Sequence, residues 1–167
     1  IFLVPVFMIF LLAKIPYGVT IAAIIFVIAA LTDSLDGYIA RSKNQVTKLG
    51  KFMDPLADKL LVTAALVSFV QMGKLPAWMV VVIISRELIV SVFRAVAASE
   101  NIVIAASSWG KAKTISQITA IIAVLINNFP FSLVNFPFST IAIWVAVILT
   151  IISGVDYIYA NKKVLKQ

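Results

Sequence analysis

The 167-residue sequence contains no cysteine and no histidine, and only 13% of its residues are charged. The absence of cysteine excludes disulfides and thiolate chemistry. The absence of both residue types excludes haem and nearly every zinc or copper site. A metal ion bound by this protein would therefore need oxygen ligands, which favours Mg²⁺, Mn²⁺ or Ca²⁺.

The shortage of charge accompanies a large apolar content, with 62% hydrophobic residues and a mean hydropathy of +1.09. Soluble domains carry about twice this share of charged residues, roughly 25%. In lipid only helices and closed barrels satisfy the backbone, and long continuous apolar runs favour helices. The composition predicts an all-α membrane protein.

Six apolar segments predict a six-transmembrane-helix bundle formed by one domain, residues 1–167. The first segment is shorter than the roughly 20 residues that a crossing needs, so we expect the start of its helix to be missing. The segments are Ile1–Ala13, Tyr17–Ala40, Phe52–Met72, Pro76–Ala98, Lys113–Ile126 and Pro137–Ala160.

Lysine and arginine are abundant in the connections on one side of the predicted bundle and scarce in those on the other. They concentrate in the loop 41–51, in the segment before the fifth helix and in the tail, whereas the other side holds Lys14 and Lys74. The positive-inside rule places the basic side in the cytoplasm. The net charge of +7 then indicates cytoplasmic loops and anionic lipid, and we expect no nucleic-acid partner.

Four of the seven acidic residues fall within a short stretch on either side of the first basic loop. Asp33 and Asp36 are spaced i, i+3 near the end of the second segment, and Asp54 and Asp58 are spaced i, i+4 in the third. Each pair shares a helix face, and both lie at the cytoplasmic boundary.

Four carboxylates near lipid need a compensating interaction, because insertion of one charged side chain deep in a transmembrane helix costs about 2.5–3.5 kcal/mol. They form either an oxygen cage for one or two divalent cations or a structural network with Arg41, Lys51 and Lys59. Gly37, Ala40 and Gly50 permit close approach of a helix or of a ligand. Arg41 is either a phosphate ligand or an interfacial arginine.

Together these residues form the pattern Asp33-x2-Asp36-Gly37-x2-Ala40-Arg41-x8-Gly50-x3-Asp54-x3-Asp58. The pattern resembles the signature of the CDP-alcohol phosphatidyltransferases at every fixed position. The resemblance implies that the four aspartates hold two divalent cations, Mg²⁺ or Mn²⁺, that bind the pyrophosphate of a CDP-lipid. It also implies that Asp58 is the catalytic base, and that the CDP-lipid is bound by Asp33, Gly37, Ala40, Arg41 and Gly50.

A second, basic cluster follows in the fourth and fifth segments. We expect Arg86, Arg94, Lys111 and Lys113 to bind an anionic acceptor, with Arg86 facing either a ligand phosphate or an internal acid, Glu87 or Asp58. The segments SRELIVSVFR and SSWGKAKT resemble the family branch whose acceptor is sn-glycerol 3-phosphate.

The resemblance implies transfer of a phosphatidyl group from CDP-diacylglycerol to glycerol 3-phosphate. It also implies that the protein is a homodimer in the bacterial cytoplasmic membrane, in contact with membrane lipids. The alternatives are a sister enzyme that uses inositol phosphate, serine, another alcohol or phosphatidylglycerol, and an ion-coupled transporter. A transporter site is expected nearer the bilayer midplane, at broken helices.

Overall fold

The computed structural model describes residues 2–13, 15–42, 48–99 and 107–161; the side chains of residues 33–42, 48–58 and 99 are not described. Within these ranges the chain is all-helical, as predicted. Six α-helices and one short 3₁₀ helix follow one another along the chain: α1 Leu3–Leu12, α2 Gly18–Ser42, α3 Lys48–Gln71, α4 Ala77–Ser99, α5 Ser108–Leu125, η1 Phe131–Val134 and α6 Phe138–Ala160.

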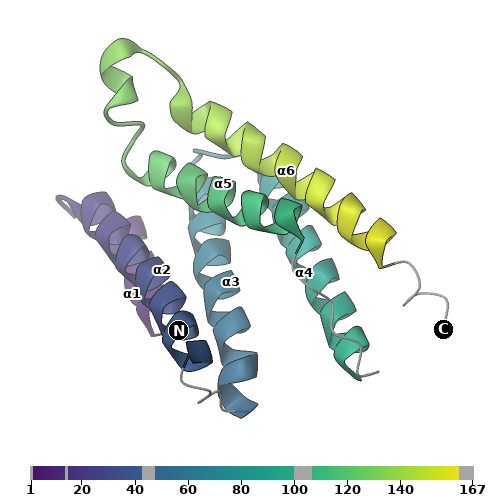
Figure 1. The fold of residues 1–167 in the computed structure, drawn as a ribbon. Helices are drawn as coiled ribbons and strands as arrows, with labels where there is room; N and C mark the ends of the chain where they lie inside the picture. The colour runs from purple at the N-terminus through teal and green to yellow at the C-terminus, as the bar shows by residue number, and fades with distance from the viewer. Residues whose placement is uncertain (1, 14, 43–47, 100–106, 162–167) are drawn as a thin grey trace.

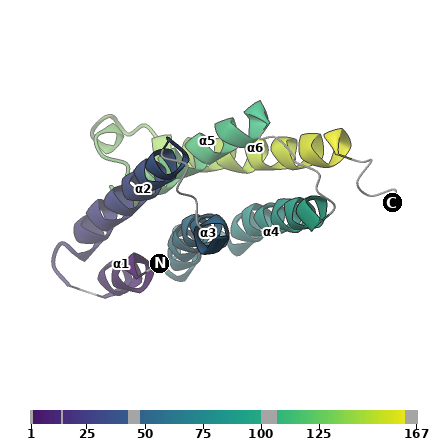
Figure 2. The same ribbon diagram turned by 60° about the horizontal axis from the view of Figure 1, so that its bottom comes forward.

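The helices form two layers, which are seen most clearly in Figure 2, with α1, α3 and α4 in one row and α2, α5 and α6 in the other. Each end helix of one row packs against the end helix of the other, α1 on α2 and α4 on α6. α3 is central: it packs against α1, α2, α4 and α5. Figure 1 shows α5 and α6 as an antiparallel pair that crosses the α3–α4 pair.

The core lies where α3 meets its neighbours. Leu61, Ala65, Leu66 and Phe69 of α3 are buried together with Phe7 of α1 and apolar residues of the other helices. Burial of a Leu or Phe side chain contributes about 1.5–3 kcal/mol where the alternative is water. This packing fixes α3, which carries two of the motif aspartates, relative to α4 and α5.

The predicted turns at Pro16 and at Gly73-Lys74-Leu75 are confirmed, because helices end just before them and begin just after them. The predicted start of the fifth helix is wrong. α5 begins at Ser108, five residues before Lys113, because the Ser107 hydroxyl accepts a hydrogen bond of 3.1 Å from the backbone N–H of Gly110 and caps the helix. Lys111 therefore lies on α5 and not in the connection before it.

Among the described residues, one helix, Phe138–Ala160, is long and apolar enough on its own to cross a membrane. Shorter apolar stretches occupy Leu3–Leu12, Gly18–Thr32 and Lys59–Gln71. The helices α2, α3 and α4 are long, with 23 to 25 residues each, and combine an apolar portion with charged residues.

Candidate active site

The four motif aspartates fall on two neighbouring helices. Asp33 and Asp36 belong to α2, Asp54 and Asp58 belong to α3, and the two helices pack against each other. Carboxylate oxygens are the ligands that Mg²⁺ and Mn²⁺ prefer, so this donor set fits a divalent cation. The side chains of these aspartates lie outside the described part of the structure, together with those of Gly37, Ala40, Arg41 and Gly50.

Helix α3 is joined to the basic cluster on α4 through Lys59, which follows Asp58 directly in the sequence. The Lys59 ammonium donates a hydrogen bond to the hydroxyl of Ser91 on α4. That hydroxyl in turn donates to the backbone carbonyl of Glu87 at 2.6 Å. These contacts connect the middle of α3 to the part of α4 that carries the charged residues.

Glu87 is the centre of the ion pairs in the described part of the chain. Its Oε1 accepts a hydrogen bond from the ammonium of Lys113 on α5 and lies 3.5 Å from Nη1 of Arg86. Lys113 is 4% exposed, and this carboxylate is a counter-charge for its buried ammonium. Arg86 also donates from Nη2 to the hydroxyl of Ser153 on α6 at 2.5 Å.

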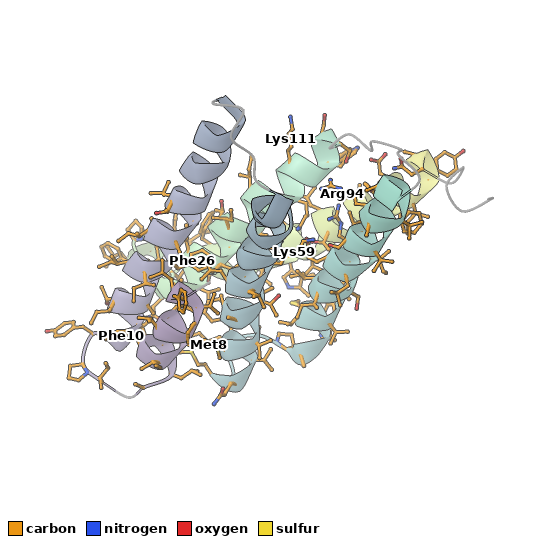
Figure 3. The ribbon with its side chains drawn as sticks, turned by 90° about the horizontal axis from the view of Figure 1, so that it is seen from below. Met8, Phe10, Phe26, Lys59, Arg94 and Lys111 are labelled. Atoms are coloured by element: carbon orange, nitrogen blue, oxygen red, sulfur yellow. The ribbon has the colours of Figure 1, made fainter. Side chains whose placement is uncertain are left out.

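The charged groups of Arg94 and Lys111 have different surroundings. The guanidinium carbon of Arg94 lies 5.8 Å from the centre of the Tyr157 ring on α6, a cation–π contact. The Lys111 side chain is exposed on the first turn of α5. Figure 3 shows Lys59, Arg94 and Lys111 on three different helices, α3, α4 and α5.

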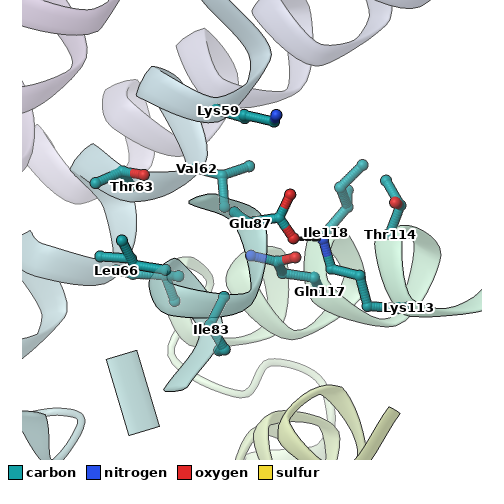
Figure 4. Close-up of a pocket in the computed structure, with 11 residues that line it drawn as sticks. Lys59, Val62, Thr63, Leu66, Ile83, Glu87, Lys113, Thr114, Gln117 and Ile118 are labelled. Atoms are coloured by element: carbon teal, nitrogen blue, oxygen red, sulfur yellow. Dashed lines mark hydrogen bonds and ion pairs between the residues drawn. The ribbon is translucent and has the colours of Figure 1, made fainter. Parts of the chain in front are cut away.

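A small cavity of about 40 Å³ lies between α3, α4 and α5. The polar side chains that line it are those of Lys59, Thr63, Glu87, Lys113, Thr114 and Gln117. Figure 4 shows the Glu87–Lys113 pair at its wall. The space is sufficient for a water molecule. Within the described chain the Gln117 side-chain nitrogen is buried without a hydrogen-bond partner, so the cavity still offers a donor to a small polar group.

The structure brings Arg86 and Lys113 of the predicted acceptor set together around Glu87, and it places Arg94 two turns beyond Arg86 on α4. Of the two acids expected as alternative partners of Arg86, Glu87 lies 3.5 Å from it, and the side chain of Asp58 lies outside the described residues. Sequence reasoning missed Ser153 and Tyr157, which contact the two arginines. Their only signal in the sequence is the i, i+4 spacing of two polar groups within an apolar helix.

The chain belongs to the CDP-alcohol phosphatidyltransferase family, whose sequence profile matches residues 1–152. An all-helical bundle that carries the family motif on two adjoining helices agrees with this membership.

Relatives named CDP-diacylglycerol–glycerol-3-phosphate 3-phosphatidyltransferase occur in several bacteria. The protein of Bacillus subtilis is 50% identical, with 98% of this chain and 91% of that protein covered. The protein of Haemophilus influenzae is 39% identical, with 96% and 87% covered. The protein of Rickettsia bellii is 33% identical, with 96% and 89% covered.

Proposed function

We propose that this protein transfers the phosphatidyl group of CDP-diacylglycerol to sn-glycerol 3-phosphate, which gives phosphatidylglycerol phosphate and CMP. Family membership and the names of the relatives support the reaction class and both substrates. The structural observation that carries the choice of acceptor is the group of cations on α4 and α5. Four basic side chains on these two helices, with Glu87 paired to Arg86 and Lys113, suit an acceptor that brings its own phosphate dianion.

In the proposed site the aspartates Asp33, Asp36, Asp54 and Asp58 hold a pair of divalent cations, Mg²⁺ or Mn²⁺. When bound, these cations reduce the negative charge of the diphosphate and stabilise the departing CMP. Gly37, Ala40, Arg41 and Gly50 take the CDP portion of the lipid. The protein's own part in the reaction is to position the two substrates and to remove one proton.

The proposed reaction is a single displacement at phosphorus. The Asp58 carboxylate accepts the proton of the acceptor hydroxyl, and the hydroxyl oxygen forms a bond to the phosphorus that carries the diacylglycerol. The bond between this phosphorus and the oxygen that bridges to CMP breaks, and CMP leaves with that electron pair. Lys59 links the helix of Asp58 to α4, so base and acceptor site are held on one framework.

Arg86, Arg94, Lys111 and Lys113 are the proposed ligands of the acceptor phosphate. Lys111 is exposed and free to approach an incoming anion, whereas Lys113 and Arg86 reach it from the buried Glu87 cluster. A guanidinium can bind two phosphate oxygens at once, which orients the acceptor and also strengthens its binding.

We further propose that all six helices cross the bacterial cytoplasmic membrane and that the active site faces the cytoplasm. Support comes from the outer surface of the bundle, where large apolar side chains are exposed on both α4 and α6. They include Val81, Leu88, Val92, Trp144, Ile148, Ile151 and Val155. Exposed apolar side chains on two packed helices suit contact with lipid or with a second copy of the chain, and a homodimer is part of the proposal.

The test is release of CMP by purified protein in detergent with CDP-diacylglycerol and Mn²⁺. Addition of glycerol 3-phosphate should start the release, whereas inositol phosphate, serine and phosphatidylglycerol should not. Release with one of those acceptors alone would refute the acceptor assignment and retain the chemistry. Ion-coupled transport by the protein, without release of CMP, would refute the proposal that it is an enzyme.

A further inference from the structure

One face of α6 carries two buried polar residues that contact α4. Ser153 and Tyr157 are separated by four residues, so they lie on the same side of the helix. They are 0% and 2% exposed. The family profile ends at residue 152, and neither residue belongs to the motif or to the basic cluster. Each contacts one of the two arginines of α4.

The Arg86 guanidinium is held from two sides. Its Nη2 donates to the Ser153 hydroxyl at 2.5 Å, and its Nη1 lies 3.5 Å from Glu87. The neighbouring Gly154 makes room for the aliphatic part of the arginine, because a Cβ at this position would lie 3.1 Å from Arg86 Cγ. The Nε atom of Arg86 is buried and has no hydrogen-bond partner in the described chain. A buried donor without a partner is unfavourable, and an incoming phosphate oxygen would satisfy it.

Arg94 lies against the ring of Tyr157, with 5.8 Å between the guanidinium carbon and the ring centre. The ring is itself fixed by Phe93, which it meets edge-on at 6.3 Å with an interplanar angle of 84°. A guanidinium over an aromatic face loses rotational freedom and keeps its N–H groups available at the edge of its plane. The contact therefore orients Arg94 without consuming its hydrogen-bond donors.

We propose that Ser153 and Tyr157 are positioning residues, which set the directions of Arg86 and Arg94 so that both guanidinium groups meet the phosphate of the acceptor. This inference rests on the proposed function, since it names the element that orders the acceptor site. α6 thereby acts in recognition of the anionic acceptor, although it contributes no charged group that contacts the substrate.

The chain offers a matched control for the hydroxyl. Thr150 lies on α6 close to Ser153 and is also 0% exposed, but its hydroxyl donates to the backbone carbonyl of Ala146 at 2.6 Å and has no hydrogen bond to an arginine among the described side chains. Ser153→Ala and Thr150→Val each remove one buried hydroxyl from the same helix. Only the first removes a hydrogen bond to a charged group.

Steady-state kinetics with both substrates provide the main test. Ser153→Ala should raise the KM for glycerol 3-phosphate on the order of tenfold, the effect of one lost hydrogen bond to a charge. The KM for CDP-diacylglycerol should change by less than about twofold, and Thr150→Val should leave both constants unchanged. Equal effects of Ser153→Ala on the two KM values, or the same result for Thr150→Val, would overturn the proposal.

Tyr157 is tested by a pair of substitutions. Tyr157→Leu removes the ring and should raise the KM for glycerol 3-phosphate by about two- to fivefold, the range expected for a cation–π contact whose cation is exposed to solvent. Tyr157→Phe keeps the ring face and should restore most of the acceptor affinity. No rescue by Tyr157→Phe would show that the ring does not position Arg94.

A double-mutant cycle separates this inference from the proposed function, because it needs no turnover. The denaturation midpoints of Arg86→Met, Ser153→Ala and the double variant in detergent should reveal coupling between the two side chains. Additive effects would overturn the positioning role. Coupling in a protein that releases no CMP with glycerol 3-phosphate would instead refute the proposed function and leave the contact established.

Discussion

Replacement of Glu87 by glutamine should destabilise the protein strongly, because it leaves two cations without their shared counter-charge. Glu87 lies 3.5 Å from Arg86 and accepts a hydrogen bond from Lys113, and the side chains of Glu87 and Lys113 are 19% and 5% exposed. Loss of one partner from a buried pair costs about 3–5 kcal/mol. Partial exposure of the carboxylate places our expectation near the lower end, at roughly 3 kcal/mol.

The assay is a reversible denaturant titration in detergent micelles, with the free energy of unfolding compared between variants. The double variant Glu87→Gln/Lys113→Met also removes the buried ammonium and should regain part of the lost stability, because Arg86 is then the one cation of the cluster left without Glu87. Lys111→Gln is the control, since Lys111 is exposed and its loss should change stability by less than about 0.5 kcal/mol. A Glu87→Gln variant as stable as the parent, or a double variant less stable than Glu87→Gln, would refute the reasoning.

The remaining predictions concern the chemistry, the acceptor, the metal and one turn. Asp58→Asn should abolish CMP release while equilibrium binding of the CDP-lipid is partly retained; normal turnover would remove Asp58 from the role of base. Lys111→Ala should raise the KM for glycerol 3-phosphate more than that for CDP-diacylglycerol, and the reverse order would show that the acceptor site is misplaced. Chelation by EDTA should stop CMP release and added Mg²⁺ or Mn²⁺ should restore it, whereas full activity in EDTA would contradict a metal role for the aspartates. Burial lowers the pKa of Lys74, in the turn between α3 and α4. The folded state then binds fewer protons than the unfolded state, so the free energy of unfolding should rise with pH between the lowered pKa and the ordinary lysine value. Lys74→Met should remove that rise, and an identical slope in parent and variant would exclude Lys74 as its source.

The helices were largely predictable because their signals are local. Long apolar runs, with Pro16 and Gly73 at the connections, predicted the number of helices and most of their boundaries. The start of α5 was missed because its first turns are polar, and the capping serine Ser107 gives a weaker signal than the apolar run that follows. The hydrophobic pattern reports the apolar part of a helix, whereas backbone hydrogen bonding continues into the polar flanks.

The candidate site was predictable in part. Residue type and spacing sufficed to identify the aspartate motif and the basic cluster, since both lie within short sequence distances. The contacts of Arg86 with Ser153 and of Arg94 with Tyr157 span more than 60 residues. Such contacts depend on how α6 packs against α4, which no local pattern encodes.

The central claim is that the carboxylates of α2 and α3 converge on divalent cations, and anomalous scattering from crystals grown with Mn²⁺ and CDP tests it most directly. We expect manganese peaks whose protein ligands are Asp33, Asp36, Asp54 and Asp58, next to the diphosphate of CDP. Bound CDP without a manganese peak, with these carboxylates paired to lysine and arginine side chains, would contradict it.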